Sequence, residues 1–388
     1  MNYKNILKYI FLYLTVFSSA GLNFTLPESN RNSLSFYQNN LQHRVIDESD
    51  SSEFSSDGPV IVYEEGNIKS YSVIPGSNDF KTSVKTIGAE DILSCYVDEK
   101  GDQFNFRLKE SVNTENDVYD LPEKMLILSD IEGNFKGFYL ILKGAGVINE
   151  NFEWTFGNGH LVLVGDFFDR GLNVTECLWL IYKLEYEAEQ SGGKVHFILG
   201  NHEMMVLRGD LRYVRAKYFS NADSLKLSYD KWFAKNTELG KWLRSKNAVE
   251  KIGDYLFVHA GISKDFPADT FSLTDINVNI RLSIDKTFPG GKTSKDIFIG
   301  SGGPLWYRGI IKETETQEDV EKTLSVFNSS KMIAGHTIVD SIKHLYNGKV
   351  IAIDLDHNEN TKKGVMFALW FENGKFYMID NNGLKSEL

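Results

Sequence analysis

Five short polar blocks, from residue 130 onward, carry side chains that can bind metal ions. They are Asp130-Ile131-Glu132, Gly165-Asp166-Phe167-Phe168-Asp169-Arg170-Gly171, Gly200-Asn201-His202-Glu203, His259-Ala260-Gly261 and Gly335-His336-Thr337. Carboxylate, amide and imidazole groups together form a mixed oxygen and nitrogen ligand set, which suits Mn, Fe, Zn or Mg and lacks the thiolates of a structural zinc site. The glycines beside these residues allow tight turns and close approach of a ligand. The blocks therefore predict a metal centre built from distant parts of the chain.

Apolar runs precede these blocks and predict the strands that position them. The runs cover residues 125–128, 160–164, 194–199 and 255–258. Residues 174–190 have helical periodicity and follow Asn173, a suitable N-cap. Alternation of strands and helices predicts an α/β fold with a largely parallel, buried sheet. Ligands bind outside the carboxyl ends of the strands in such sheets, so the polar blocks are expected to meet there.

Further strands are predicted near the C-terminus. They cover residues 350–354, 364–371 and 375–379, and Glu372-Asn373-Gly374 between the last two is a hairpin turn. Asp354, Asp356 and His357 follow the first of these strands. We interpret them as part of a solvated loop rather than a third metal site.

In this order the five blocks resemble the motifs of the calcineurin-like metallophosphoesterases: GD-x-HG, GD-x-x-DRG, GNHE, HAG and GH. The second and third motifs are matched residue for residue, a pairing characteristic of the phosphoprotein phosphatase branch. Residues 209–214 (GDLRYV) and 303–308 (GPLWYR) look most like the Shewanella-like bacterial subgroup. The resemblance covers about residues 123–388. It implies an α/β/β/α sandwich of two mixed sheets, with a dimetal site at the C-terminal ends of the strands.

The resemblance also implies a set of metal ligands for two divalent ions, with Mn favoured over Fe, Zn or Mg. These ligands are Asp130, Glu132, Asp166, Asn201, His259 and His336. Asp130 and Glu132 would hold the first ion, Asp166 would bridge both, and the other three would complete the second site. Such a pair of ions clamps a phosphate, activates a bridging hydroxide for attack, and stabilises the attacking and leaving oxygens.

Catalytic and substrate-binding roles follow from the same resemblance. His202 would protonate the leaving oxygen and would be oriented by Asp169. Arg170 would bind phosphate oxygens through two parallel hydrogen bonds, which a lysine cannot do. Arg308 would be a second phosphate clamp and Arg212 a third.

Glu132 departs from the family motif, which has His at this position. A carboxylate adds negative charge and favours the harder ions Mn, Fe or Mg over Zn. The alternative is that Glu132 only hydrogen-bonds to neighbours. That arrangement would leave a weak first site and would lower activity or change the preferred metal.

The N-terminus predicts export. Residues 1–20 carry Lys4 and Lys8, an apolar run over residues 9–17 that is too short to span a bilayer, and then Ser18-Ser19-Ala20. We expect a cleaved signal peptide, a periplasmic or secreted protein, and no stable membrane span after cleavage. An N-terminal membrane anchor is the alternative.

The remaining chain divides by composition. Residues 21–57 predict a polar linker. Residues 58–112 predict a small β module, with strands at 59–63, 68–74, 94–97 and 104–108. The polar stretch 113–120 would separate this module from a phosphoesterase domain at 121–388. Cap or insertion segments are expected at about 205–250 and 262–330.

Composition limits the possible partners. The 388 residues include 42 Lys and Arg against 53 Asp and Glu, a net charge of −11, which disfavours nucleic-acid binding. It leaves open a phosphorylated substrate bound through metal ions. Export would permit a disulfide between Cys95 and Cys177, but the apolar surroundings of Cys177 favour a buried thiol.

These observations predict an exported, dimetal-dependent phosphatase that hydrolyses phosphate monoesters of a phosphoprotein or a small molecule. One alternative is a phosphodiesterase or dinucleoside polyphosphate hydrolase, because the same dimetal site serves both reactions. Another is a non-catalytic, metal-dependent binding module, which the change at Glu132 and the extra β module at 58–112 would suit.

Overall fold

The computed structural model describes residues 56–76, 79–97, 102–286 and 296–388. All of these lie in one compact unit, Ser49–Leu388. The predicted signal peptide and all but the end of the predicted linker lie outside the described residues. Within the described part of the chain, no helix has the length and apolar character needed to cross a membrane.

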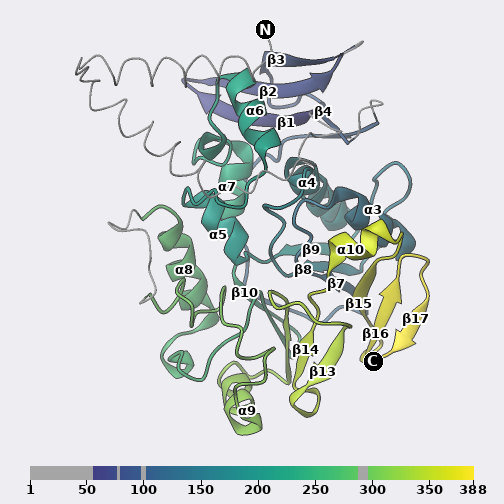
Figure 1. Ribbon diagram of the computed structural model, residues 1–388, viewed down its shortest axis with the longest axis vertical. Helices are drawn as coiled ribbons and strands as arrows, with labels where there is room; N and C mark the ends of the chain where they lie inside the picture. The colour runs from purple at the N-terminus through teal and green to yellow at the C-terminus, as the bar shows by residue number, and fades with distance from the viewer. Residues whose placement is uncertain (1–55, 77–78, 98–101, 287–295) are drawn as a thin grey trace, which may run out of the picture. The chain divides into compact units, whose positions relative to one another are not determined.

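Two six-stranded mixed sheets form the centre of the molecule (Figure 1). The first has the order β17-β16-β15-β7-β8-β9. Its strands are β7 (Lys124–Leu128), β8 (His160–Leu163), β9 (Lys194–Phe197), β15 (Phe367–Glu372), β16 (Lys375–Asp380) and β17 (Lys385–Glu387). Strands β7, β8 and β9 are parallel, and the C-terminal strands add antiparallel pairs. Every residue of these three parallel strands except the first of each is buried, as the apolar runs predict.

The second sheet has the order β13-β14-β12-β11-β10-β6. Its strands are β6 (Val118–Tyr119), β10 (Val249–Ile252), β11 (Tyr255–Val258), β12 (Lys331–Ala334), β13 (Lys343–Leu345) and β14 (Val350–Ala352). Strands β11, β12 and β14 are parallel, whereas β10 pairs antiparallel with β11 and β13 pairs antiparallel with β14. The fold is therefore less parallel than the sequence alone predicts, because β10 and β11 form a tight hairpin.

Helices lie along both sheets (Figure 1). Beside the first sheet are α3 (Phe135–Gly144), α4 (Val174–Gln190) and α10 (His357–Lys362), and beside the second are α8 (Leu273–Ile284) and α9 (Gln317–Val326). The segment after β9 contains α5 (Asn201–Leu207), α6 (Ala216–Leu225) and α7 (Glu238–Arg244). Single 3-10 turns are η2 (Tyr229–Lys231), η3 (Ala268–Thr270) and η4 (Tyr346–Gly348). The predicted α/β/β/α arrangement is confirmed.

The polar stretch at 113–120 does not separate two domains. Val118 and Tyr119 form β6, which pairs in parallel with β10 at the edge of the second sheet. Glu115 forms ion pairs with Lys194 and Lys246, at 3.0 and 2.8 Å. A two-residue strand has no periodicity to detect, so this pairing is visible only in the folded chain.

The predicted N-terminal β module is present and packs directly on the helices that follow it. Its strands are β1 (Asp57–Glu64), β2 (Asn67–Pro75) and β3 (Phe80–Ile87) in one antiparallel sheet, and β4 (Leu93–Tyr96) with β5 (Gln103–Phe106) in a hairpin. The indole of Trp179 on α4 donates to the Pro59 carbonyl at 2.8 Å and stacks on Phe106 at 4.3 Å. Cys95 and Cys177 are both buried free thiols.

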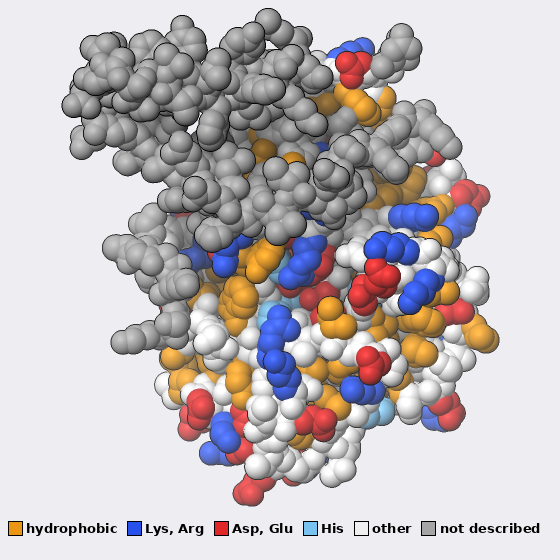
Figure 2. Space-filling view, in the orientation of Figure 1, with side chains coloured by type: hydrophobic (Ala, Val, Ile, Leu, Met, Phe, Trp, Pro, Cys, Tyr) orange, Lys and Arg blue, Asp and Glu red, His pale blue; other side chains and the backbone are white. Residues whose placement is uncertain are grey.

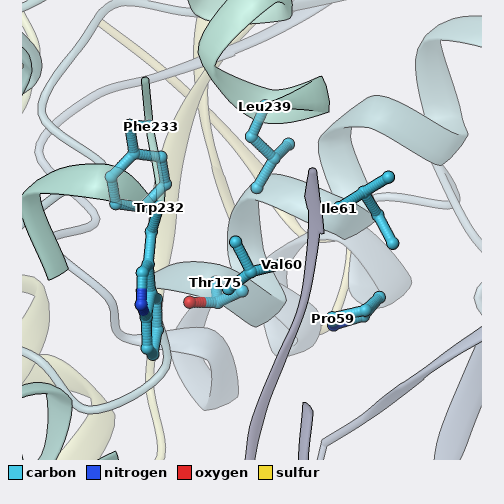
Figure 3. A pocket seen from close by; sticks show the side chains of 7 residues that line it. All are labelled: Pro59, Val60, Ile61, Thr175, Trp232, Phe233 and Leu239. Carbon is cyan, nitrogen blue, oxygen red and sulfur yellow. The ribbon is translucent and has the colours of Figure 1, made fainter. Parts of the chain in front are cut away.

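The contact between β1 and the helices is closely packed. Figure 3 shows Val60 of β1 on the side of the strand where Thr175 and Trp232 lie, and Pro59 and Ile61 on the other side. These residues line a gap with no room for a water molecule, together with Phe233 and Leu239. Trp232 and Phe233 are buried, as expected for the core of a helical cap. The module therefore adds to the same core that supports the polar blocks.

Candidate metal centre

The polar blocks follow strand ends with sharp backbone turns. Asp130, Glu132, Asp166 and His336 have φ values of 53°, 49°, 60° and 63°, in the left-handed region that non-glycine residues rarely adopt. The turns are cross-linked, since the Asp130 amide donates to the Gly165 carbonyl and the Glu132 amide to the Asp166 carbonyl, both at 2.9 Å. Clustered backbone strain of this kind is typical of functional sites.

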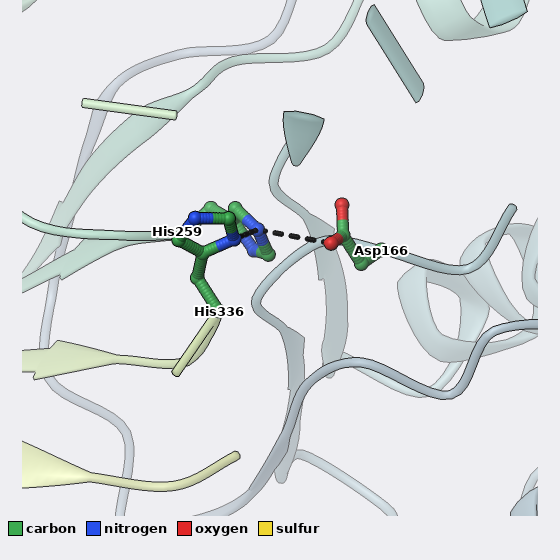
Figure 4. Close-up of side chains that lie close together, drawn as sticks. All are labelled: Asp166, His259 and His336. Carbon is green, nitrogen blue, oxygen red and sulfur yellow. Dashed lines mark hydrogen bonds and ion pairs between the residues drawn. The ribbon is translucent and has the colours of Figure 1, made fainter. Parts of the chain in front are cut away.

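Asp166, His259 and His336 form the first of two groups of potential metal ligands. One ligand atom from each lies within 4.8 Å of the others, and all three residues are buried (Figure 4). His259 Nε2 lies 3.1 Å from Asp166 Oδ2 and 3.2 Å from His336 Nδ1. Asn201 joins this group, because its Oδ1 lies 3.0 Å from His259 Nε2. The structure thus brings together the four residues that the resemblance assigns to the bridge and the second ion.

The donor set of this group fits a divalent cation. His259 Nδ1 bonds to the Val164 carbonyl at 2.9 Å, which leaves Nε2 directed at the other ligands. His336 Nε2 is buried and has no hydrogen-bond partner among the described residues. Buried imidazole nitrogens are normally hydrogen-bonded, so the unpaired nitrogen of His336 is consistent with a ring placed to bind a ligand.

Glu132, Asp166 and His202 form the second group, again with ligand atoms within 4.8 Å. Asp166 belongs to both groups, as expected of a bridging ligand. Asp130, which the resemblance assigns to the first ion, is not in either group. Its Oδ2 instead accepts a hydrogen bond from the His336 amide at 3.0 Å.

The charges of this centre are strongly coupled. Burial, together with the charge of Asp166, raises the pKa of Asp130 to about 6. Burial opposes protonation of His259, but Asp166 and Asp130 outweigh it and raise the pKa of this imidazole to about 10. Burial and the neighbouring His259 lower the pKa of His336 to about 2. Without a metal ion, His259 therefore carries the positive charge that balances the carboxylates.

His202 and Asp169 form a buried pair next to the shared carboxylate. His202 Nδ1 lies 2.6 Å from Asp169 Oδ2, and its Nε2 lies 3.9 Å from Asp166 Oδ2. Burial opposes protonation, but Asp166 and the bond to Asp169 raise the pKa of His202 above its ordinary value. The imidazole is thus held in a fixed orientation, and its raised pKa favours the protonated form that a general acid requires.

The three predicted phosphate-binding arginines differ in their surroundings. Arg170 forms an ion pair with Glu132 and lies over the Tyr213 ring at 5.3 Å. Arg308 is exposed and donates to the His336 carbonyl, at 2.5 Å. Arg212 is paired with Asp210 through two guanidinium nitrogens, Nε and Nη2, at 2.8 Å each, so much of its charge is already balanced.

The space-filling view shows this face of the molecule. Near the middle of Figure 2, His side chains and Asp or Glu side chains lie between Lys or Arg side chains and hydrophobic ones. Positive side chains around a recessed group of carboxylates and imidazoles suit an anionic ligand that also contacts metal ions.

Two residues near the centre have roles that the sequence analysis did not assign. The Glu203 carboxylate accepts hydrogen bonds from the backbone amides of Asp166 and Gly200, at 2.9 and 2.7 Å, and from two further amides of the same loop. Tyr213 has its ring 5.3 Å from that of His202. Glu203 stands in the GNHE motif and Tyr213 in residues 209–214, so both were within the matched motifs.

Asp354 lies beside the centre and not in a solvated loop. It is 3% exposed, and burial together with the charge of Asp130 raises its pKa well above the ordinary value. Asp354 follows β14, which runs parallel to β12, the strand that leads to His336. The interpretation as a solvated loop was wrong for Asp354 because strand order, which places β14 next to β12, is not encoded locally. It was also wrong for His357, which is 3% exposed at the start of α10, whereas Asp356 is exposed.

Comparisons with known proteins agree with this geometry. A model of the family described as calcineurin-like phosphoesterase matches residues 123–340. The chain is 28% identical over 327 residues to Shewanella-like protein phosphatase 2 of Arabidopsis thaliana, which covers 71% of this chain and 83% of that protein. It is also 28% identical over 224 residues to Shewanella-like protein phosphatase 1 of Plasmodium berghei, which covers 55% of this chain and 61% of that protein.

A solved structure is similar over most of its length. The cold-active protein-tyrosine phosphatase of a psychrophilic Shewanella species is 32% identical, with a TM-score of 0.76, over 86% of this chain and 99% of that one. The resemblance read from the five motifs is thus confirmed. Because the family model spans more than half of the chain, this protein belongs to the calcineurin-like phosphoesterase family of metal-dependent hydrolases.

Proposed function

We propose that this chain is a dimetal-dependent phosphatase that hydrolyses phosphate monoesters, with phosphorylated protein side chains as the main substrate class. The buried His202–Asp169 pair beside Asp166 is the observation that carries the proposal. A monoester with an alkoxide or phenoxide leaving group needs a proton donor at the leaving oxygen. Asp169 orients His202 for that role, and the raised pKa of its imidazole favours the protonated form.

The residues of the centre divide the work. Asp166, Asn201, His259 and His336 would hold one divalent ion, and Glu132 with Asp166 would reach the other. Two such ions, when bound, supply Lewis-acid activation and neutralise charge on the phosphate.

The protein side chains around this centre hold the substrate and transfer the proton. Arg170 and Arg308 bind phosphate oxygens at the exposed rim. His202 donates its Nε2 proton to the leaving oxygen. Asp169 keeps the ring aligned by accepting from Nδ1.

Phosphotyrosine is the protein substrate to test first. The similar Shewanella enzyme is described as a protein-tyrosine phosphatase. In this chain the half-exposed ring of Tyr213 lies next to His202, where the leaving group of the ester would lie. An aromatic leaving group can pack against such a ring.

The experiment compares hydrolysis of an aryl phosphate monoester and the matching diester, with added Mn and with chelator. Wild type, Asp166→Asn and His202→Asn are measured beside the surface control Glu64→Gln. Glu64 lies on β1 and pairs with Lys69, so its variant should behave as wild type. We expect Mn-dependent monoester turnover that is lost in the first two variants.

Two other functions predict different results from the same assay. Diester turnover that exceeds monoester turnover would favour a phosphodiesterase or dinucleoside polyphosphate hydrolase. Binding of phosphate without hydrolysis of either ester would favour a metal-dependent binding module. Turnover that is unchanged in Asp166→Asn would contradict all three.

We also propose that the chain is exported. The support is the composition of residues 1–20, with two lysines, an apolar run and small residues before Gly21. N-terminal sequencing of the protein recovered from its producing cells tests this. A chain that begins near Gly21 is expected, and an intact Met1 in that protein would contradict cleavage.

A further inference from the structure

The Glu132 carboxylate lies next to Arg170 and also belongs to a group of potential metal ligands. It forms an ion pair with the guanidinium of Arg170. The same carboxylate has a ligand atom within 4.8 Å of those of Asp166 and His202. One side chain therefore lies between the phosphate-binding arginine and the position of the first metal ion.

The backbone holds both residues, but only one side chain has room to move. The backbone amide of Glu132 donates a hydrogen bond to the Asp166 carbonyl at 2.9 Å, which fixes the residue, and its side chain is 12% exposed. The Arg170 amide donates to the Tyr213 carbonyl at 3.0 Å, while its side chain is 44% exposed. The guanidinium can thus turn toward the open rim while the carboxylate stays in place.

We propose that Glu132 is shared between Arg170 and the first divalent ion, so that binding of this ion weakens the ion pair and frees Arg170 for phosphate. The inference rests on the proposed function, because it assigns Arg170 to the phosphate. A divalent ion carries twice the charge of a guanidinium and attracts the carboxylate more strongly. The family motif has a neutral imidazole at this position, which cannot form this ion pair.

Linkage makes the coupling reciprocal. If the ion weakens the pair between Glu132 and Arg170, then removal of Arg170 must tighten binding of the ion. Plain repulsion between Arg170 and a cation has the same sign but does not require Glu132. The two effects therefore separate when residue 132 is also changed.

The first experiment measures Mn affinity by competition with a chromophoric chelator, with no substrate present. The proteins are wild type, Arg170→Gln, Glu132→His and the double variant, with Glu64→Gln as a surface control. We expect Arg170→Gln to tighten Mn binding in the protein with Glu132. This gain in affinity should be about threefold larger than the gain from the same change in Glu132→His, which is the scale of a partly exposed ion pair. Equal changes in both backgrounds, or weaker binding in Arg170→Gln, would overturn the proposal.

The second experiment measures binding of inorganic phosphate to the metal-free protein by calorimetry. Glu132→Gln should bind phosphate about threefold more tightly than wild type, because its arginine is free, and added Arg170→Gln should remove this gain. A gain that persists without Arg170 would overturn the proposal, since it would reflect only the lost negative charge.

Turnover of an aryl phosphate by the same proteins separates the two proposals. Coupled Mn and phosphate binding without any turnover would contradict the proposed function alone. Turnover in wild type without coupling between positions 132 and 170 would contradict only the sharing of Glu132.

Discussion

Glu203 holds together two of the turns that carry metal ligands. Its Oε2 accepts from the amides of Asp166 and Gly200 at 2.9 and 2.7 Å, and its Oε1 accepts from those of Phe167 and Phe168 at 2.7 and 3.3 Å. The side chain is fully buried. Burial and the charge of Asp166 raise its pKa to about 7. Through these four hydrogen bonds the Glu203 carboxylate connects the turn after β8 to the start of α5.

Glu203→Gln keeps the shape of the side chain and removes half of its acceptors. One carboxylate oxygen becomes an NH2 group, which leaves two of the four amides facing a donor. A buried hydrogen-bonding group without a partner costs about 1–3 kcal/mol, so the free energy of unfolding should fall by about 2–6 kcal/mol. Because Asp166 is anchored by this residue, Mn affinity should fall by about 10- to 100-fold, as when other supporting residues of metal ligands are lost.

Urea unfolding of the metal-free proteins and Mn titration of the folded ones measure the two effects separately. Glu64→Gln is the matched control, since the same chemical change on β1 removes only a surface ion pair and should alter stability by less than about 0.5 kcal/mol. If Glu203→Gln unfolds like this control and binds Mn like wild type, the reasoning about the four amides is refuted.

Three further predictions concern buried charges. Lys246→Met removes the buried cation that lies 2.6 Å from Glu185 and 2.8 Å from Glu115, and leaves each carboxylate with one lysine, Lys109 or Lys194. The free energy of unfolding in urea should fall by about 3 kcal/mol, and an unchanged value would contradict this prediction. The pKa of Glu115 is lowered to about 2 because Lys246 and Lys194 outweigh burial. The stability that ionised Glu115 contributes is therefore present above pH 4.5 and should be lost as pH falls toward 2. Acid titration of Lys246→Met should show much less of this loss. The pKa of His259 is near 10, so Mn must displace a proton from this imidazole to bind it. Mn affinity should therefore keep rising with pH above 6.5, the ordinary pKa of histidine. A pH-independent affinity in that range would count against His259 as a metal ligand.

The polar blocks and the strands before them could be predicted because their signals are local. The runs that became β7, β8 and β11 end within one or two residues of the predicted positions, and α4 has the predicted bounds. A fully buried strand must be apolar throughout, so the first polar residue after it marks its end. Parallel neighbours then bring Asp130 and Asp166 to the same edge without further information.

The partners of each ligand could not be predicted in this way. The bond from the His336 amide to Asp130 joins positions 206 residues apart. The burial of Asp354 depends on β14 lying next to β12, and the ion pair of Glu132 depends on the second block placing Arg170 beside the first. Such contacts depend on sheet order and on how the two sheets pack, which no short stretch of sequence encodes.

By itself, the sequence determined the α/β class, the family and the residue types at the metal centre, because these follow from periodicity and from short motifs. Only the tertiary structure decided which donor faces which. It ties Asp130 to the His336 backbone, anchors Asp166 through Glu203, and pairs Glu132 with Arg170. Charges interact through space and not along the chain, so their pairing is a property of the folded molecule.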